Sequence, residues 1–258
     1  MDFKVISSKD NATIKFAKQL LDKKARKESG KMLIEGKKTI SDLLKLNVKI
    51  EMIFCSNNTQ EFVKNLNPPP STQCVLCENN IISQITHQTT SQEVVAIVDI
   101  PQQKSLLPNT NFLALDGLQD AGNIGTIMRT ALATGFNTIY LIDCVDISNP
   151  KVVDSSMTAI FHLNLVRIGR EEFIDLVKQN DLKLLSAELN GENACAMSVP
   201  CGIIGLVIGN EGNGVSDLVS QNSFKKITLP MSQSIESLNA SVSAGILMYL
   251  IKMKNGEF

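Results

Sequence analysis

The sequence predicts an α/β protein whose larger part is a parallel sheet flanked by helices. Short apolar segments alternate with stretches of helical periodicity along most of the 258 residues, and such alternation is typical of parallel sheets because each crossover needs a helix. A polar segment with two prolines, residues 101–109, interrupts the alternation. We therefore expect an α/β domain over residues 1–100, a linker over 101–110 and a larger α/β domain over 111–258.

The first domain is predicted from its apolar spacing. Ile14, Ala17, Leu20 and Leu21 recur at helical intervals, which predicts one helix over residues 8–27. The polar stretch 57–72 contains three consecutive prolines and predicts an exposed loop. Strands are expected at 32–36, 50–55, 74–76 and 94–98, with helices around 40–44 and 79–85.

The second domain is predicted from six apolar segments separated mostly by helical stretches. A long helix with one apolar side is expected over about residues 238–254. The strands are expected at 112–115, 138–142, 163–166, 182–186, 203–208 and 226–229.

Composition excludes several classes of protein. No apolar run approaches the roughly 18 residues of a membrane helix, and the N-terminus lacks the apolar core of a secretion signal, so we expect a cytoplasmic protein. Cys74 and Cys77 form a CxxC pair without a second pair, and the sequence has two histidines. We expect buried thiols here and no metal.

Charge is distributed unevenly along the chain. The net charge is −1, yet residues 1–31 carry nine basic and four acidic side chains. This excess suits contact with a phosphate backbone, and it equally suits a solvated helix face.

Three segments have the composition of an active site. Residues 113–129 predict a strand, a glycine-rich turn and a helix carrying Asn123 and Arg129. These two residues share one side only if the helix begins just after Asn123. Residues 205–215 predict a strand ending in a glycine-rich turn with one acid, Glu211. Its G-x-x-G-x-G order differs from the dinucleotide-binding pattern, and it lacks the Lys-Ser/Thr of a phosphate loop.

The third segment, residues 227–245, predicts a strand, a loop and a helix start. Ser237 and Asn239 are candidates for the N-cap, and the small residues that follow permit close packing. Taken singly, each of the three segments also fits an ordinary turn or a tightly packed helix.

Together the three segments resemble the motifs of the SpoU/TrmH branch of the SPOUT methyltransferases. The matching residues are Asn-Ile-Gly-x-x-x-Arg at 123–129, Ile-Gly-Asn-Glu-Gly-x-Gly at 208–214, and Leu-Pro-Met with Ser-Leu-Asn at 229–231 and 237–239. The resemblance spans about residues 112–252. More loosely, residues 6–8, 24–26, 33–36 and 89–92 resemble the RNA substrate-binding domain of this family. Thr158 and Glu93 stand where the family usually has glycine.

The resemblance implies a fold, a cofactor and an assembly. The fold would be a parallel sheet with a C-terminal trefoil knot, a rare exception to the rule that chains do not thread loops. The cofactor would be S-adenosylmethionine. The assembly would be a homodimer in which an arginine reaches the partner's donor site. The implied cofactor-binding residues are Ala187, Gly209, Asn210, Ile227, Leu229, Ser237 and Leu238.

The implied reaction is methylation of a ribose 2′-hydroxyl, with Arg129 as the central catalytic residue. Arginine is practically never deprotonated, which favours Arg129 as an electrostatic organiser, although a role as the base stays open. We expect Glu211 to align Arg129 through a bidentate ion pair. Asn123 and Asn239 would position the ribose or the arginine, and Ser237 would hold the loop or a phosphate.

The implied substrate is RNA, with large-subunit ribosomal RNA favoured by the N-terminal domain. The alternatives are a transfer RNA substrate and an RNA-binding relative without catalytic activity. A nicotinamide-dependent oxidoreductase would need the dinucleotide-binding pattern that is missing here.

Overall fold

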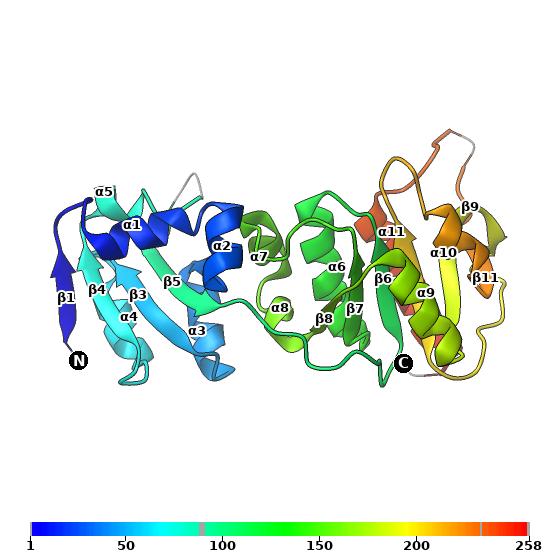
Figure 1. Ribbon diagram of the computed structural model, residues 1–258, viewed down its shortest axis with the longest axis horizontal. Coiled ribbons are helices and arrows are strands. Elements are labelled where there is room, and N and C mark those ends of the chain that lie inside the picture. The colour runs from blue at the N-terminus through cyan, green and yellow to red at the C-terminus, as the bar shows by residue number, and fades with distance from the viewer. Residues whose placement is uncertain (1, 88–90, 233, 257–258) are drawn as a thin grey trace. The chain divides into compact units, whose positions relative to one another are not determined.

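The computed structural model describes residues 2–87, 91–232 and 234–256, and it contains two compact units. Met1–Pro101 forms the first unit together with Ile147–Phe161, while Gln102–Asp146 and His162–Phe258 form the second (Figure 1). The predicted α/β class is confirmed, and so is the parallel sheet. No helix in the described part of the chain is long and apolar enough to cross a membrane.

The first unit contains a mixed five-stranded sheet in the order β1-β4-β3-β5-β2. β1, β4 and β3 are parallel, and β5 runs antiparallel to both β3 and β2. Apolar side chains such as Ile14, Phe54 and Ile97 form its core. The elements are β1 (Phe3–Ile6), α1 (Ala12–Gln19), α2 (Lys23–Ser29), β2 (Lys31–Glu35), α3 (Lys37–Lys45), β3 (Ile50–Cys55), α4 (Gln60–Leu66), β4 (Gln73–Cys77), α5 (Asn79–Ile82), β5 (Val94–Asp99) and α7 (Pro150–Ser156).

Two sequence-based predictions for this unit are wrong in detail, and one strand was not predicted. The single helix expected over 8–27 is two helices, because Asp22 accepts a hydrogen bond from the Lys24 amide at 2.7 Å and starts α2 anew. The loop expected over 57–72 contains α4, which buries Val63. The edge strand β1 was not predicted, since a four-residue segment with Val5 71% exposed has too little pattern.

The expected burial of the CxxC thiols is confirmed. Cys74 and Cys77 are buried and carry free thiols. Burial raises the pKa of Cys77 to about 11, so its thiol stays protonated at neutral pH.

The second unit contains a parallel six-stranded sheet in the order β11-β9-β10-β6-β7-β8. Its strands match the predicted segments closely, except that β9 runs on to Asn193. The elements are β6 (Phe112–Asp116), α6 (Ala121–Thr134), β7 (Thr138–Ile142), α8 (Ala159–His162, whose last residue alone lies in this unit), β8 (Asn164–Arg167), α9 (Arg170–Gln179), β9 (Lys183–Asn193), β10 (Ile204–Gly209), α10 (Asp217–Gln221), β11 (Lys225–Thr228) and α11 (Ala240–Lys254).

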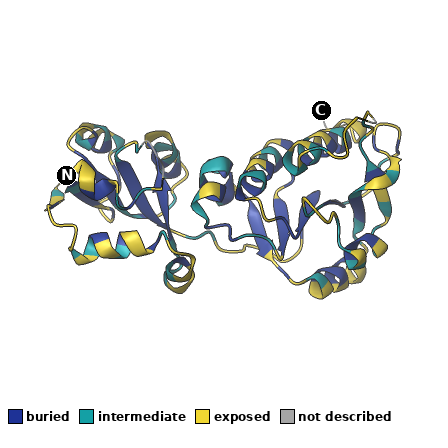
Figure 2. Cartoon of the chain, turned by 90° about the horizontal axis from the view of Figure 1, so that it is seen from above, coloured by how far each residue is buried: buried dark blue, intermediate teal, exposed yellow. Residues whose placement is uncertain are grey.

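Helices cover both faces of the parallel sheet. On one face Phe112 and Tyr140 pack edge to face with ring centroids 5.2 Å apart, and Phe173 of α9 joins them. α6 and α11 pack against each other, and a Cβ added at Gly245 would lie 3.6 Å from Thr130. Sheet and helices are mostly buried where they meet (Figure 2). Because parallel strands end at one common edge, the loops that follow β6, β9, β10 and β11 gather there.

Candidate active site

A cavity of about 810 Å³ lies at the carboxyl edge of the parallel sheet. Its wall comes from the ends of β9, β10 and β11, the loops that follow them, and the start of α11. The volume falls within the roughly 300–1,000 Å³ typical of small-ligand sites. Every residue predicted to bind the cofactor lines it, namely Ala187, Gly209, Asn210, Ile227, Leu229, Ser237 and Leu238.

Asn210 shapes the turn that follows β10. Its backbone exchanges two hydrogen bonds of 2.9 Å with Gly214, and its side-chain oxygen accepts the amide of Gly212 at 2.9 Å. Its side-chain nitrogen donates to the Gly117 carbonyl at 2.8 Å. A Cβ at Gly209 would lie 2.1 Å from the carbonyl carbon of Gly214, so the turn closes only with glycine there.

A wide bulge in β9 supplies another part of the wall. The pairing with β11 jumps from Ser186 with Lys226 to Glu192 with Ile227, which leaves residues 187–191 outside the ladder. Ala187 from this bulge lines the cavity. A Cβ at Gly191 would lie 2.5 Å from the backbone of Ile227, so glycine is needed at this crossing.

Glu211 accepts hydrogen bonds from three N–H donors. The side chain of Asn123 donates at 3.2 Å, the Asp120 amide at 3.2 Å, and the Gln119 amide at 3.4 Å. Partial burial opposes ionisation of Glu211, but these donors and its own amide outweigh burial and lower its pKa. Glu211 therefore carries a negative charge at neutral pH.

Asn239 connects the third motif to the first. Its side-chain nitrogen donates to the side-chain oxygen of Asn123 at 3.0 Å. Its own oxygen accepts the Ser241 amide at 2.9 Å, which makes Asn239 the N-cap of α11. A continuous path of hydrogen bonds thus joins Asn239, Asn123 and Glu211, one residue from each predicted motif. Ser237 is exposed and lines the cavity beside them.

The expected ion pair between Arg129 and Glu211 is wrong for the single chain. Within residues 2–87, 91–232 and 234–256, Arg129 makes no ion pair, and it does not line the cavity. The reason is helix phase, because α6 begins at Ala121 and already includes Asn123. Six residues at about 100° each place Arg129 well round the helix from Asn123. Arg129 is exposed there.

Sequence reasoning missed a buried charge at the end of β6. Asp116, 1% exposed, accepts the Arg170 Nε at 2.8 Å and the Ser216 amide at 2.8 Å. Arg170 also pairs with Asp143, a residue held at a φ of 50°. The side chain of Gln119 donates to the Asp143 carbonyl at 2.8 Å. The only signal in the sequence was an aspartate at the end of an apolar strand.

A second polar cluster lies in the first unit. Glu35, at the end of β2, accepts the Thr86 hydroxyl at 2.5 Å and both the amide and the ring Nδ1 of His87 at 2.7 Å. The other ring nitrogen of His87 lies 2.8 Å from Asp154 of α7. Asp154 and then Glu35 raise the pKa of His87 to about 9, so the imidazole is protonated at neutral pH.

One departure from the family pattern has a structural explanation. Glu93 adopts a φ of 59°, a conformation that glycine adopts without cost. Its carboxylate accepts hydrogen bonds from Ser56 at 2.6 Å and Asn79 at 2.7 Å, which hold the residue in place. Near Thr158 the positive φ of 55° belongs to Met157 instead. Residues 89–92 were among those that resemble the substrate-binding domain of the family, and two of them, Thr89 and Thr90, lie outside the described residues.

The chemical character of the residues that line the cavity suits S-adenosylmethionine. Its wall combines apolar side chains, such as Ile208 and Leu247, with backbone groups and a few polar side chains. That mixture suits an adenosine group, whose flat base needs apolar cover and whose ribose and amino groups need polar partners.

Two family models match the chain. The model described as the SpoU rRNA methylase family matches residues 110–249, and that of the MRM3-like substrate binding domain matches residues 11–96. The chain belongs to the SpoU rRNA methylase family. This membership confirms the predicted methyltransferase class and the S-adenosylmethionine cofactor.

One relative and two solved structures match this chain over nearly its whole length. It is 30% identical to the 23S rRNA (guanosine(2553)-2′-O)-methyltransferase RlmP of Bacillus subtilis, over 96% of this chain and 99% of that protein. An RNA methyltransferase structure of the TrmH family from Porphyromonas gingivalis matches with a TM-score of 0.84 and 27% identity, over 93% of this chain and 97% of that one. An AdoMet-bound rRNA methyltransferase structure from Sinorhizobium meliloti matches with a TM-score of 0.87 and 25% identity, over 97% and 98%.

Proposed function

We propose that this protein methylates a ribose 2′-hydroxyl of large-subunit ribosomal RNA, in the cytoplasm. The observation that carries the proposal is the hydrogen-bonded path from Glu211 through Asn123 to Asn239 beside the cavity. Similarity to RlmP, which by its name acts on 23S rRNA, supports the choice of RNA. The trefoil knot implied by the family remains a prediction.

The chain's own residues have distinct roles in this reaction. Backbone groups around Gly209 and Leu229, with the side chains of Ile227 and Leu238, would hold the cofactor. S-adenosylmethionine supplies an electrophilic methyl group when it is bound. Asn123 and Asn239 present amide groups that can orient a ribose hydroxyl. Ser237, exposed at the rim, can donate to a phosphate oxygen.

Arg129 stabilises the developing negative charge on the ribose oxygen in this proposal. A guanidinium that stays charged is suited to this task and poorly suited to accepting a proton. Because Arg129 lies outside its own chain's cavity, we propose that it serves the cavity of a second copy in a homodimer.

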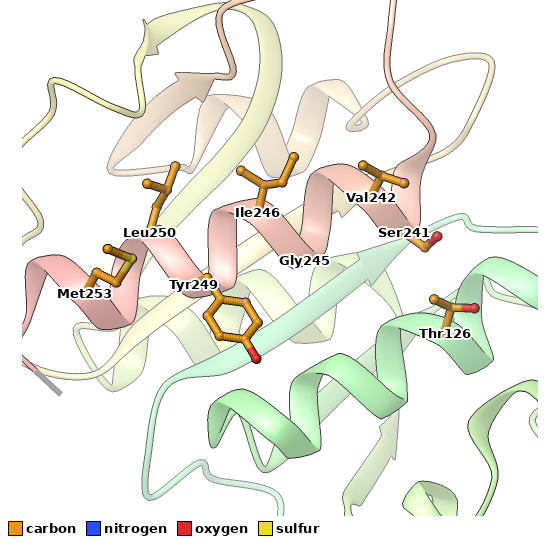
Figure 3. Close-up of a pocket in the computed structure, with 8 residues that line it drawn as sticks. All are labelled: Thr126, Ser241, Val242, Gly245, Ile246, Tyr249, Leu250 and Met253. Atoms are coloured by element: carbon orange, nitrogen blue, oxygen red, sulfur yellow. The ribbon is translucent and has the colours of Figure 1, made fainter. Parts of the chain in front are cut away.

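An apolar groove on α11 supports the dimer. Val242, Ile246, Tyr249 and Met253 form a stripe along the helix and are 41–62% exposed (Figure 3). Together with Thr126 of α6 they line a shallow groove of about 500 Å³. Exposed apolar stripes of this kind are typical of protein interfaces. Thr126 precedes Arg129 by three residues, so an interface here would bring Arg129 to the partner.

The basic N-terminal segment supports RNA binding by the first unit. Lys18, Lys23 and Lys27 are exposed on α1 and α2, and within the described residues none of them has an acidic partner. Unpaired lysines on one segment are available to phosphates.

Methyl transfer from labelled donor to ribosomal RNA tests the proposed reaction. We expect label on a ribose 2′-oxygen of large-subunit RNA, and Arg129→Ala should lose transfer while it keeps donor binding. Label on a base would refute the reaction, and label confined to transfer RNA would refute the substrate.

Mixing two inactive variants tests the shared site. Arg129→Ala and Glu211→Ala subunits should each be inactive alone, yet their mixture should recover about a quarter of wild-type activity, since half of the dimers are mixed and each has one intact site. No recovery in a mixture that exchanges subunits would show that Arg129 serves its own chain.

A further inference from the structure

The charged side chains that line the cavity are all acidic. Among the lining residues in the described part of the chain, three are glutamates, and none is lysine, arginine or histidine. The cofactor changes charge during the proposed reaction. Its sulfonium sulfur is positive before transfer, and the product's thioether sulfur is neutral. A negative wall therefore interacts differently with the two molecules. The three residues are Glu188, Glu211 and Glu236.

Two of these carboxylates already have partners. Glu188 accepts the Ser186 hydroxyl at 2.7 Å and lies 3.2 Å from the Lys226 ammonium, whose positive charge offsets its own. Glu211 is engaged by the three N–H donors described above. In the proposed dimer it also faces the Arg129 of a second copy. Neither carboxylate has an unopposed charge to offer a ligand.

Glu236 differs from both. It immediately precedes Ser237 and lines the cavity with an exposed side chain. No other residue in the described ranges forms a hydrogen bond or ion pair with it. Because none of the cations among the described residues is paired with Glu236, its field acts on whatever occupies the cavity, weakened by solvent and salt.

We propose that Glu236 is a specificity-determining residue that favours the positively charged methyl donor over the neutral product. This inference rests on the proposed function. In the transfer, the ribose oxygen bonds to the methyl carbon, and the electron pair of the sulfur–carbon bond stays on sulfur. The ribose proton leaves to solvent. The bound molecule thereby loses its positive charge, the attraction to Glu236 weakens, and product release is favoured over donor release.

The test is calorimetric binding to the full-length protein and does not depend on turnover. The ligands are S-adenosylmethionine, S-adenosylhomocysteine and sinefungin, whose protonated amine replaces the sulfonium as the positive centre. Glu236→Gln keeps the size of the side chain and removes its charge. Glu171→Gln removes the same charge from an exposed position on α9 away from the cavity, and it is the matched control.

We expect Glu236→Gln to weaken binding of S-adenosylmethionine and sinefungin by about fivefold, the order expected of one charge across a few ångströms near solvent. Binding of S-adenosylhomocysteine should stay unchanged, as should all three affinities in Glu171→Gln. The difference should shrink as salt is raised.

Equal losses for all three ligands, or no loss for any, would overturn the inference. The first result would place Glu236 against the amino group that all three share, and the second would place it out of reach. If the wild-type protein bound none of the three, the cofactor assignment would fail instead.

Discussion

Glu211 in the second unit and Glu35 in the first are both carboxylates that collect hydrogen bonds from a neighbouring loop, yet their partners differ in charge. Glu35 is 5% exposed and faces a protonated His87, which in turn faces Asp154. Glu211 is exposed, and the donors that contact it within its own chain are neutral amides. Within one chain, the carboxylate that is paired with a cation stabilises the fold, while the carboxylate held by neutral donors can still pair with a cation from outside the chain, which in the proposed dimer is the Arg129 of a second copy.

The surroundings explain this difference. A buried charge without a counter-ion is costly, so Glu35 needs His87 where it lies. Glu211 lies at the open edge of a parallel sheet, where solvent lowers that cost. Neutral donors fix its position there without neutralising it. The two sites should therefore respond in opposite ways to the same Glu→Gln substitution.

Glu211→Gln should give the largest effect of the series, on activity. The amide removes the negative charge and turns one of its two acceptors into a donor facing N–H groups. We expect kcat for methyl transfer to fall by about 10²–10³-fold, as when a preorganised charge is removed from an active site. The melting temperature should hardly move, because the site is exposed. A stable variant with near-normal kcat would contradict the distinction.

Glu35→Gln should give the next largest effect, on stability. The substitution leaves His87 without one of its two counter-ions and removes an acceptor from a buried position. We expect a loss of about 3 kcal/mol in the free energy of unfolding, measured by denaturant titration. Below the melting transition, kcat should remain close to wild type. A large fall in kcat with unchanged stability would mean that this cluster also takes part in catalysis.

Much of the second unit was predictable from sequence, because its strands are short apolar runs and its three motifs sit where strands end. The partners of Glu211 were not predictable. Two of them are backbone amides, and their direction depends on the loop after β6. The side of α6 on which Arg129 lies was also not predicted. It depends on the first residue of the helix, and α6 begins three residues earlier than the start just after Asn123 that would have aligned the two residues.

The first unit was harder to predict for a different reason. Its polar cluster joins residues from three distant segments, and His87 and Asp154 are 67 positions apart in the sequence. Ile147–Phe161 follows β7 in the chain but packs with the first unit. Pairings over such distances leave no periodic trace in a sequence, whereas the motif residues of the second unit are marked by their glycine-rich turns.

The charge on His87 makes stability depend on pH. Its folded pKa of about 9 lies above the ordinary value of 6.5. The stabilisation is therefore fully present below about pH 6.5 and is lost as the pH rises through about 9. Between pH 6.5 and pH 9 the melting temperature of the wild-type protein should fall by about 2–4 °C more than that of the His87→Gln variant. The same slope in the variant would show that other groups titrate there.

Asn239 allows the most selective test, because its side chain forms two hydrogen bonds with different roles. One accepts the Ser241 amide and caps α11, and the other donates to Asn123 in the candidate site. Asn239→Ser keeps an N-cap oxygen for the start of α11 and loses the nitrogen that donates to Asn123. We expect kcat to fall by about tenfold with little change in stability. Asn239→Ala loses the cap as well and should cost about 1 kcal/mol of stability in addition.

The contrast between these two variants decides how Asn239 acts. If the bond to Asn123 positions the Glu211 path, the serine variant should lose activity as fully as the alanine variant, although only the alanine variant is less stable. If the serine variant had full activity, the contribution of Asn239 would lie in capping α11, and its hydrogen bond to Asn123 would not contribute to catalysis. Measuring kcat and KM at a temperature well below both melting transitions separates the two results.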